Sequence, residues 1–159
     1  MNKENESIIT ELEKLLRGGG AHVGFNEAMA NIPEHLLGER PHQLPYSIWQ
    51  LTEHIRIAQA DMLDFCRNAH YQALNWPDDY WPKEPAPKDK SAFEDSVKAI
   101  NADLDEFIEL LDKGDLYTPI PHGDGQTLLR EALQIADHTA YHLAEIVVLR
   151  RLLNDWKAT

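Results

Sequence analysis

Apolar residues recur at alternating spacings of three and four along most of this chain, which is the period of one helix face. The clearest stripe begins behind a capping box in which Ser47 would cap the helix and Gln50 would reach back to its amide. Its members are Ile48, Leu51, Ile55, Ala58, Met62 and Phe65. Similar stripes predict helices over residues 5–17, 91–111 and 127–154. No convincing strand pattern is present, so the sequence predicts an all-α fold.

Glycine and proline mark the expected ends of these helices. Gly18-Gly19-Gly20 interrupts the first apolar run, which resumes over residues 21–32, and the sequence leaves open whether 5–32 is one kinked helix or two. A second capping box, Ser91 to Glu94, is expected to begin the third long helix, and Gly114 is expected to close it as residue C′. Connecting loops are predicted at 33–46, at 70–90 and at 115–126.

Helices of about 20 residues are about 30 Å long and suit a four-helix bundle. With 159 residues, of which 43% are hydrophobic, the chain is long enough to form a substantial core. We therefore expect a single helical-bundle domain over residues 1–159, with an additional N-terminal helix or helix extension.

The net charge of the chain limits the classes of partner that we expect it to bind. Its 27 acidic and 15 basic residues give a net charge of −12, and no Lys/Arg cluster is present, so neither nucleic acid nor an anionic membrane surface is expected as a partner. No apolar run approaches the roughly 20 residues of a membrane span, and the N-terminus lacks a signal-peptide core. The single cysteine, Cys66, is expected to be a buried small side chain and fits a reducing compartment, so we expect a cytoplasmic protein.

Histidines supply the candidate chemistry. His138 and His142 are four residues apart, so on a helix they share one face at the edge of the apolar side, whereas Asp137 points outward. His54 flanks the apolar stripe of another helix in the same way. Three imidazoles from two helices could bind one divalent metal ion and leave coordination positions open. Nitrogen donors suit zinc, nickel, iron and copper alike, and we expect zinc or nickel first and iron next. The alternative is that all three histidines are hydrogen-bonded core residues.

Other side chains are weaker candidates. His22 follows the glycines and could border the site, whereas we expect solvent exposure for the loop histidines His35, His42, His70 and His122. Glu131 and Glu145 are each seven residues from His138 and could orient the ligands, but we favour their interpretation as half-exposed surface acids. The predicted helices lack the Glu-x-x-His pairs of di-iron bundles. The chain also lacks the His-Glu-x-x-His of metalloproteases, the Gly-x-Ser-x-Gly of hydrolases and a phosphate-binding Gly-Lys-Ser/Thr loop.

Two segments carry a family resemblance: Pro-Tyr-Ser-Ile-Trp-Gln-Leu-Thr-Glu-His-Ile over 45–55 and Asp-His-Thr-Ala-Tyr-His over 137–142. With them the chain, from its first helix to Leu153, resembles the DinB-like (damage-inducible) superfamily of helical bundles. The resemblance implies an up-down-down-up four-helix bundle, a frequent homodimer, and a divalent metal bound by His54, His138 and His142.

The resemblance leaves two functional classes open. Some relatives use such a metal to activate a low-molecular-weight thiol, such as bacillithiol or mycothiol, so the chain could be a thiol-dependent S-transferase in detoxification or stress response. The alternative is a metal-binding stress or interaction module without turnover. No sequence feature identifies the thiol, the electrophile or a catalytic residue; the three histidines are expected only as metal ligands.

Overall fold

The computed structural model describes residues 3–156, and within that range every regular element is helical. Five α-helices follow one another along the chain: α1 (Lys3–Arg17), α2 (Phe25–Met29), α3 (Ile48–Arg67), α4 (Lys90–Lys113) and α5 (Leu128–Leu152). The predicted loops contain three short 3₁₀ helices, η1 (Glu34–Leu36), η2 (Pro41–Gln43) and η3 (Asp78–Tyr80). The prediction of an all-α bundle is confirmed.

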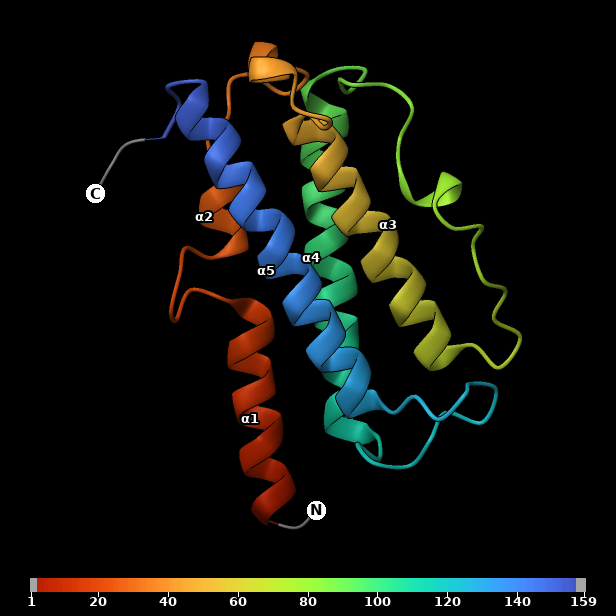
Figure 1. The fold of residues 1–159 in the computed structure, drawn as a ribbon. Helices are drawn as coiled ribbons and strands as arrows, with labels where there is room; N and C mark the ends of the chain where they lie inside the picture. Colours follow the sequence, from red (N-terminus) through yellow and green to blue (C-terminus); the bar gives the residue numbers. More distant parts are fainter. Residues whose placement is uncertain (1–2, 157–159) are drawn as a thin grey trace.

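The N-terminal region forms two helices rather than one kinked helix. Gly18 and Gly19 have φ values of +69° and +83°, in the left-handed region, so α1 cannot continue through them. After α1 the chain passes to α2, which covers the opposite half of α5, as Figure 1 shows. The two helices together therefore occupy the fourth position of the bundle, beside α3, α4 and α5.

The core consists of two apolar clusters stacked along the bundle. The first joins α2, the beginning of α3 and the end of α5, and it includes Phe25, Ile55 and Ile146. The second joins α1, the end of α3 and the beginning of α5, and it includes Leu63 and Ile135. Along α3 and α5, the two clusters are separated by about two turns of helix, and this gap is where polar side chains enter the interior.

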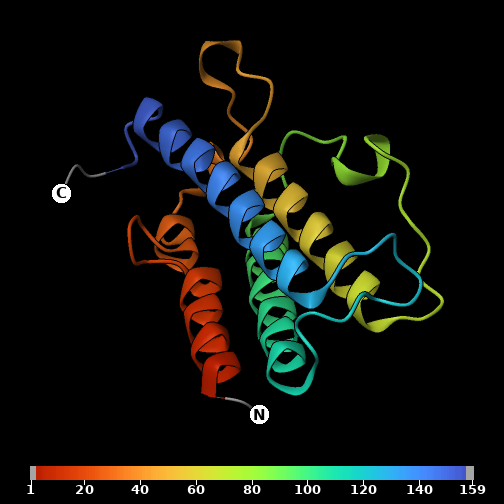
Figure 2. The ribbon, with the colours of Figure 1, turned by 60° about the horizontal axis from the view of Figure 1, so that its bottom comes forward.

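A long crossover connects α3 to α4. Figure 1 shows that both helices run from the top to the bottom of the view, so the segment 68–89 returns along the outside of α3. The segment is held to the bundle by hydrogen bonds: the Tyr80 hydroxyl donates to Asp61, and the Gln50 amide donates to the Pro82 carbonyl at 3.1 Å. Figure 2, turned to bring the bottom forward, shows the same segment beside α3. The crossover is therefore fastened at several points.

The helix ends test the predicted capping signals. The Ser47–Gln50 box is confirmed, since each side chain accepts from the backbone amide of the other residue. The box at Ser91 is wrong, because the Asp89 carboxylate accepts from the Ala92 amide at 2.9 Å and the helix begins before Ser91. The aspartate starts the helix two residues earlier than expected and caps the Ala92 amide instead of the Glu94 amide that a Ser91 box would cap.

Gly114 follows the last residue of α4 as predicted, but for a different reason. Its φ is −95°, so it is not the left-handed C′ residue that was expected. A Cβ atom there would lie 2.4 Å from Leu128 Cδ1 and 2.8 Å from the Leu110 carbonyl oxygen. The glycine is required by the close approach of α5.

No helix in the described range is long and apolar enough to cross a membrane.

We predict that Gly114→Ala lowers the free energy of unfolding by about 1–3 kcal/mol, because the added methyl group overlaps backbone as well as side-chain atoms. The matched control is Gly20→Ala, where no atom lies within 4 Å of the added carbon. That control should leave stability unchanged or slightly raised. Urea unfolding of the two variants measures the difference, and equal midpoints would contradict this account of Gly114.

Candidate metal centre

The three predicted histidines meet between α3 and α5, beside the first apolar cluster. His54 comes from α3 and the other two come from α5, which lies beside α3 in Figures 1 and 2. One nitrogen from each ring of His54, His138 and His142 lies within 4.8 Å of the others. His54 is 2% exposed and His142 is 8% exposed, whereas His138 is half-buried. The sequence-predicted pair and its partner on the facing helix are therefore brought together.

Hydrogen bonds fix the orientation of two of these rings. A carbonyl oxygen only accepts, so His54 Nδ1 carries a hydrogen and donates it to the Tyr80 carbonyl at 2.9 Å. His142 Nδ1 donates to the carboxylate of Glu145 at 2.7 Å. Both neutral rings therefore carry no hydrogen on Nε2 and present a lone pair there. Such outward contacts are the ones that metal-bound histidines usually make.

The spacing of the inward nitrogens is close to that of two ligands on one ion. His138 Nε2 lies 3.0 Å from His54 Nε2, and since His54 Nε2 carries only a lone pair, His138 donates the hydrogen between them. Two nitrogens each about 2.0–2.1 Å from a tetrahedral zinc ion would lie about 3.3 Å apart. The same pair of atoms could therefore bind a metal after a change of the His138 tautomer.

The interior keeps these rings neutral. Burial, together with smaller contributions from His142 and His54, lowers the pKa of His138 to about 4. Burial likewise lowers the pKa of His142 to about 4, with a smaller contribution from His54. Burial also lowers the pKa of His54, although its bond to the Tyr80 carbonyl acts in the opposite direction. At neutral pH all three therefore offer the lone pairs that a metal requires.

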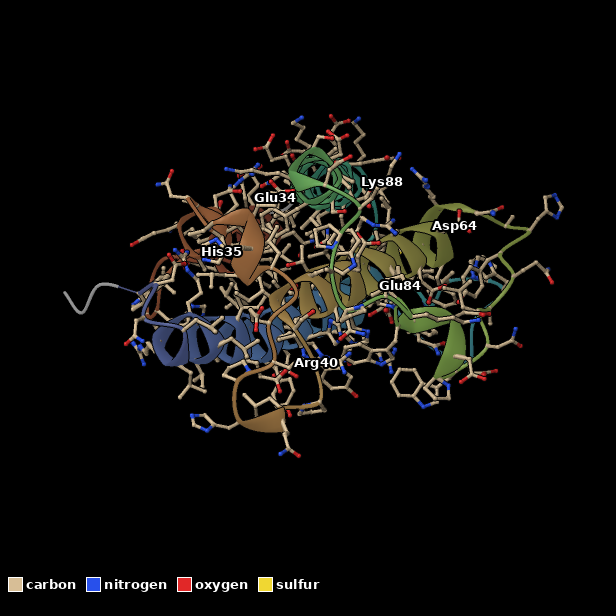
Figure 3. All side chains as sticks on the ribbon, turned by 90° about the horizontal axis from the view of Figure 1, so that it is seen from above. Glu34, His35, Arg40, Asp64, Glu84 and Lys88 are labelled. Atoms are coloured by element: carbon tan, nitrogen blue, oxygen red, sulfur yellow. The ribbon has the colours of Figure 1, made fainter. Side chains whose placement is uncertain are left out.

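Two stacked aromatic rings cover one face of the His54 imidazole. Trp81 lies flat on the imidazole with ring centroids 3.8 Å apart, and Tyr46 lies on the far side of Trp81 at 3.9 Å. Tyr46 belongs to the loop before α3 and Trp81 to the crossover, and Figure 3 views this end of the bundle with Arg40 and Glu84 marking the two loops. The sequence analysis missed both aromatic residues, because a proline-rich loop gives no periodicity from which a contact partner could be inferred.

Asp61 anchors the crossover beside the site. One of its oxygens accepts from the Tyr80 hydroxyl at 2.6 Å and the other from the Tyr71 hydroxyl at 2.9 Å. Asp61 lies seven residues after His54, so it projects from the same side of α3 two turns further along. The carboxylate therefore fixes η3, whose Tyr80 carbonyl in turn orients His54.

The two glutamates of α5 have different roles. Glu145 is half-buried and accepts from His142, so it orients a candidate ligand, and its interpretation as a mere surface acid is wrong. Glu131 is 4% exposed, so its expected half-exposure is wrong, and its partner is the Arg130 guanidinium and not a histidine. Burial raises the pKa of both carboxyls. Because both glutamates are seven residues from His138, the sequence predicts the same role for both. Their hydrogen-bond partners, Arg130 for Glu131 and His142 for Glu145, make their roles different.

The remaining candidates lie outside the site. The side chains of His22, His35, His42, His70 and His122 are all exposed. Cys66 is half-buried against the second apolar cluster, and burial raises the pKa of its thiol to about 12. Its expected role as a small packing side chain fits this position. The chain therefore contributes no thiolate to the site.

The residues present suit a divalent ion of intermediate softness. Three neutral imidazoles make a donor set that zinc, nickel and iron accept, and a site with three protein ligands leaves a position for water or substrate. A closed structural zinc site would need a fourth protein ligand. Among the described residues, these three histidines form a group of metal-binding side chains, and Glu145 is occupied by its bond to His142.

We predict that acid destabilises the metal-free protein through His138 and His142. Their pKa is about 4 in the folded protein and near 6.5 when exposed, so the unfolded chain binds more protons between these values. Stability is therefore complete above this window and falls as the pH drops through it. Urea unfolding of chelator-treated protein measures the slope, which should be shallower for His138→Gln/His142→Gln. An unchanged slope in that variant would contradict the neutral, buried state of the two rings.

Comparison with known proteins places this arrangement in a family. The sequence model of the DinB superfamily matches residues 22–146, which include α2, α3, α4, most of α5 and all three histidines. No curated protein and no solved structure gives a match to the chain. The match spans most of the sequence and both segments that contribute to the site, so the chain belongs to the DinB superfamily.

Proposed function

We propose that His54, His138 and His142 together bind one divalent metal ion, with zinc and nickel as the first candidates and iron as the next. The observation that carries the proposal is the convergence of three neutral imidazoles, of which two donate their Nδ1 hydrogens outward to oxygen acceptors. If these positions bound no metal, apolar side chains would be more stable there, because three neighbouring imidazole rings cannot provide hydrogen-bond partners for all of one another's nitrogens.

Removal of any one of these rings should abolish metal binding. We expect untagged His54→Ala, His138→Ala and His142→Ala to lose the metal that the wild-type protein retains after dialysis, as measured by plasma mass spectrometry. His22→Ala is the matched control, because that ring is exposed and should leave the metal content unchanged. Glu145→Ala should weaken binding by about 10–100-fold, the usual effect of removing an orienting carboxylate. Unchanged metal content in His54→Ala would refute the three-histidine site.

We further propose that the centre serves a cytoplasmic S-transferase that uses a low-molecular-weight thiol. When bound, the metal would supply a positive charge that lowers the pKa of a thiol in its open position. In the overall reaction, the thiol loses its proton to solvent and its sulfur forms a bond to an electrophilic carbon. The bond from that carbon to its leaving group breaks, and the leaving group takes the electron pair.

The residues of the chain support such a reaction by orientation and shielding. The Tyr80 carbonyl and the Glu145 carboxylate hold the hydrogens at Nδ1 of His54 and His142, which keeps the opposite nitrogens free. The stacked rings of Trp81 and Tyr46 exclude water from one face of His54. The thiol has to come from solution, because Cys66 lies twelve residues from His54, about 18 Å along the helix axis.

A turnover assay distinguishes an enzyme from a metal-binding module without activity. Metal-loaded protein should conjugate monochlorobimane with at least one member of a panel of low-molecular-weight thiols, including bacillithiol and mycothiol. His142→Ala should reduce the rate to background, because it removes one ligand, whereas the exposed His22→Ala should retain it. The fluorescence of the conjugate gives the rate. Retained metal with no turnover for any thiol would favour the alternative, a metal-binding stress or interaction module.

A further inference from the structure

An apolar pocket lies directly beside the histidine site. Its volume is about 340 Å³, and its walls come from the loop before α3 and from one face of α5. Leu44 and Tyr46 contribute from the loop, and Ala144 and Val148 contribute from the helix. A volume of this size lies at the lower end of the range, about 300–1,000 Å³, that is typical of small-molecule sites.

Two contacts connect the pocket to the histidines. Glu145 lines the pocket and accepts a hydrogen bond from His142 at 2.7 Å. Tyr46 also lines it and stacks on Trp81, which stacks on His54. The pocket and the histidine site therefore have a common wall. A molecule seated in the pocket would have one end next to that wall.

The lining defines the chemistry of an occupant. Its walls are aliphatic and aromatic, and of the residues that line it, Glu145 alone carries a charge at neutral pH. An apolar group would gain by leaving water there. An anionic group would meet the Glu145 carboxylate without a cation to balance it, so anions are disfavoured. Tyr141 is 64% exposed and Val148 is 47% exposed, and a bound apolar molecule would cover part of both side chains.

A second groove lies on the other flank of α5 and has a different character. Its volume is about 740 Å³, and its lining includes the glycine-rich 19–23 segment together with the polar side chains of Arg151 and Glu27. Ala144 and Val148 border both hollows, but neither His142 nor Glu145 lines the second one. The second groove therefore has no connection to the histidine site, and Leu44 distinguishes the two, because it lines only the first.

We propose that the pocket formed by the 44–46 loop and α5 binds the electrophilic substrate, and that this substrate is a small uncharged molecule with an aromatic or aliphatic group. The assignment of the ligand as the electrophile rests on the proposed S-transfer. The pocket and its preference for neutral apolar ligands rest on the lining alone. The two parts can therefore fail separately.

A matched pair of fluorescent probes tests the ligand class on the full-length protein. N-phenyl-1-naphthylamine is neutral and apolar, and 8-anilino-1-naphthalenesulfonate has the same ring system with an added negative charge. We expect the neutral probe to bind with a stoichiometry of one and at least about tenfold more tightly than the sulfonate, because the sulfonate would face the negative charge of Glu145. Glu145→Gln should narrow this difference, since it removes the charge and keeps a hydrogen-bond acceptor for His142.

Three variants locate the probe. Ala144→Trp should reduce binding by at least about tenfold because it fills the hollow, and Leu44→Asp should do the same because it places a charge in the apolar wall. Ala102→Trp is the matched control, since Ala102 is exposed on α4, away from the pocket. Helix content from circular dichroism checks that each variant folds. Binding unchanged in both pocket variants, or equal affinity for the two probes, would overturn the proposal.

Monochlorobimane tests whether the electrophile of the proposed reaction binds in the pocket. It is neutral and bicyclic, so it should displace N-phenyl-1-naphthylamine competitively, and Ala144→Trp should raise its KM while leaving the KM of the thiol unchanged. If the neutral probe binds as expected but no metal is retained, the proposed function fails and the pocket remains. A probe that never binds, with Ala144→Trp converting a dimer to a monomer in sedimentation, would assign this face to a second copy of the chain and overturn the proposal.

Discussion

The fold depends on how three imidazoles are accommodated between α3 and α5. A buried polar nitrogen without a partner costs about 1–3 kcal/mol, so six ring nitrogens between these helices require an organised set of partners. The structure provides a backbone carbonyl for His54 and a carboxylate for His142, and the His138 and His54 nitrogens share one hydrogen. Each acceptor comes from a different element. The site therefore links α3, α5 and the crossover, and disturbance of any one of them changes the other two.

The crossover is more than a connection between parallel helices. Asp61 fastens Tyr80, the Tyr80 carbonyl orients His54, and the next residue, Trp81, covers the same ring. The proline-rich composition of this segment limits its backbone freedom, which reduces the entropy lost when it docks. A segment that has to span the length of α3 in any case is thus used to build one wall of the site. The neighbouring loop before α3 completes that wall through Tyr46, and so it also shapes the adjacent pocket.

The sequence predicts what local periodicity determines and misses what depends on contacts between distant segments. The stripes of α3, α4 and α5 fixed the helices and the side on which the histidines lie, because burial of one face repeats every 3.6 residues. Nothing local distinguishes Glu145 from Glu131, since the difference is that Arg130 pairs with one and His142 with the other. Trp81 is a similar case, since its partners are 27 residues away on α3 and 35 residues away on the preceding loop. Gly114 was placed correctly for the wrong reason, because its constraint is the approach of Leu128 rather than its own φ.

The histidine site departs from the packing that would make this bundle most stable. Leucines in place of the three rings would bury more apolar surface and would stabilise the fold. The chain instead keeps three neutral imidazoles in contact, with a hydrogen bond between His138 and His54, and their inward nitrogens are the groups that a cation would bind. Local departures from the most stable packing tend to occur at functional sites. The stability given up at these three positions is thus the physical argument for a ligand there, and the apolar pocket on the other side of Glu145 lies where a second molecule could reach it.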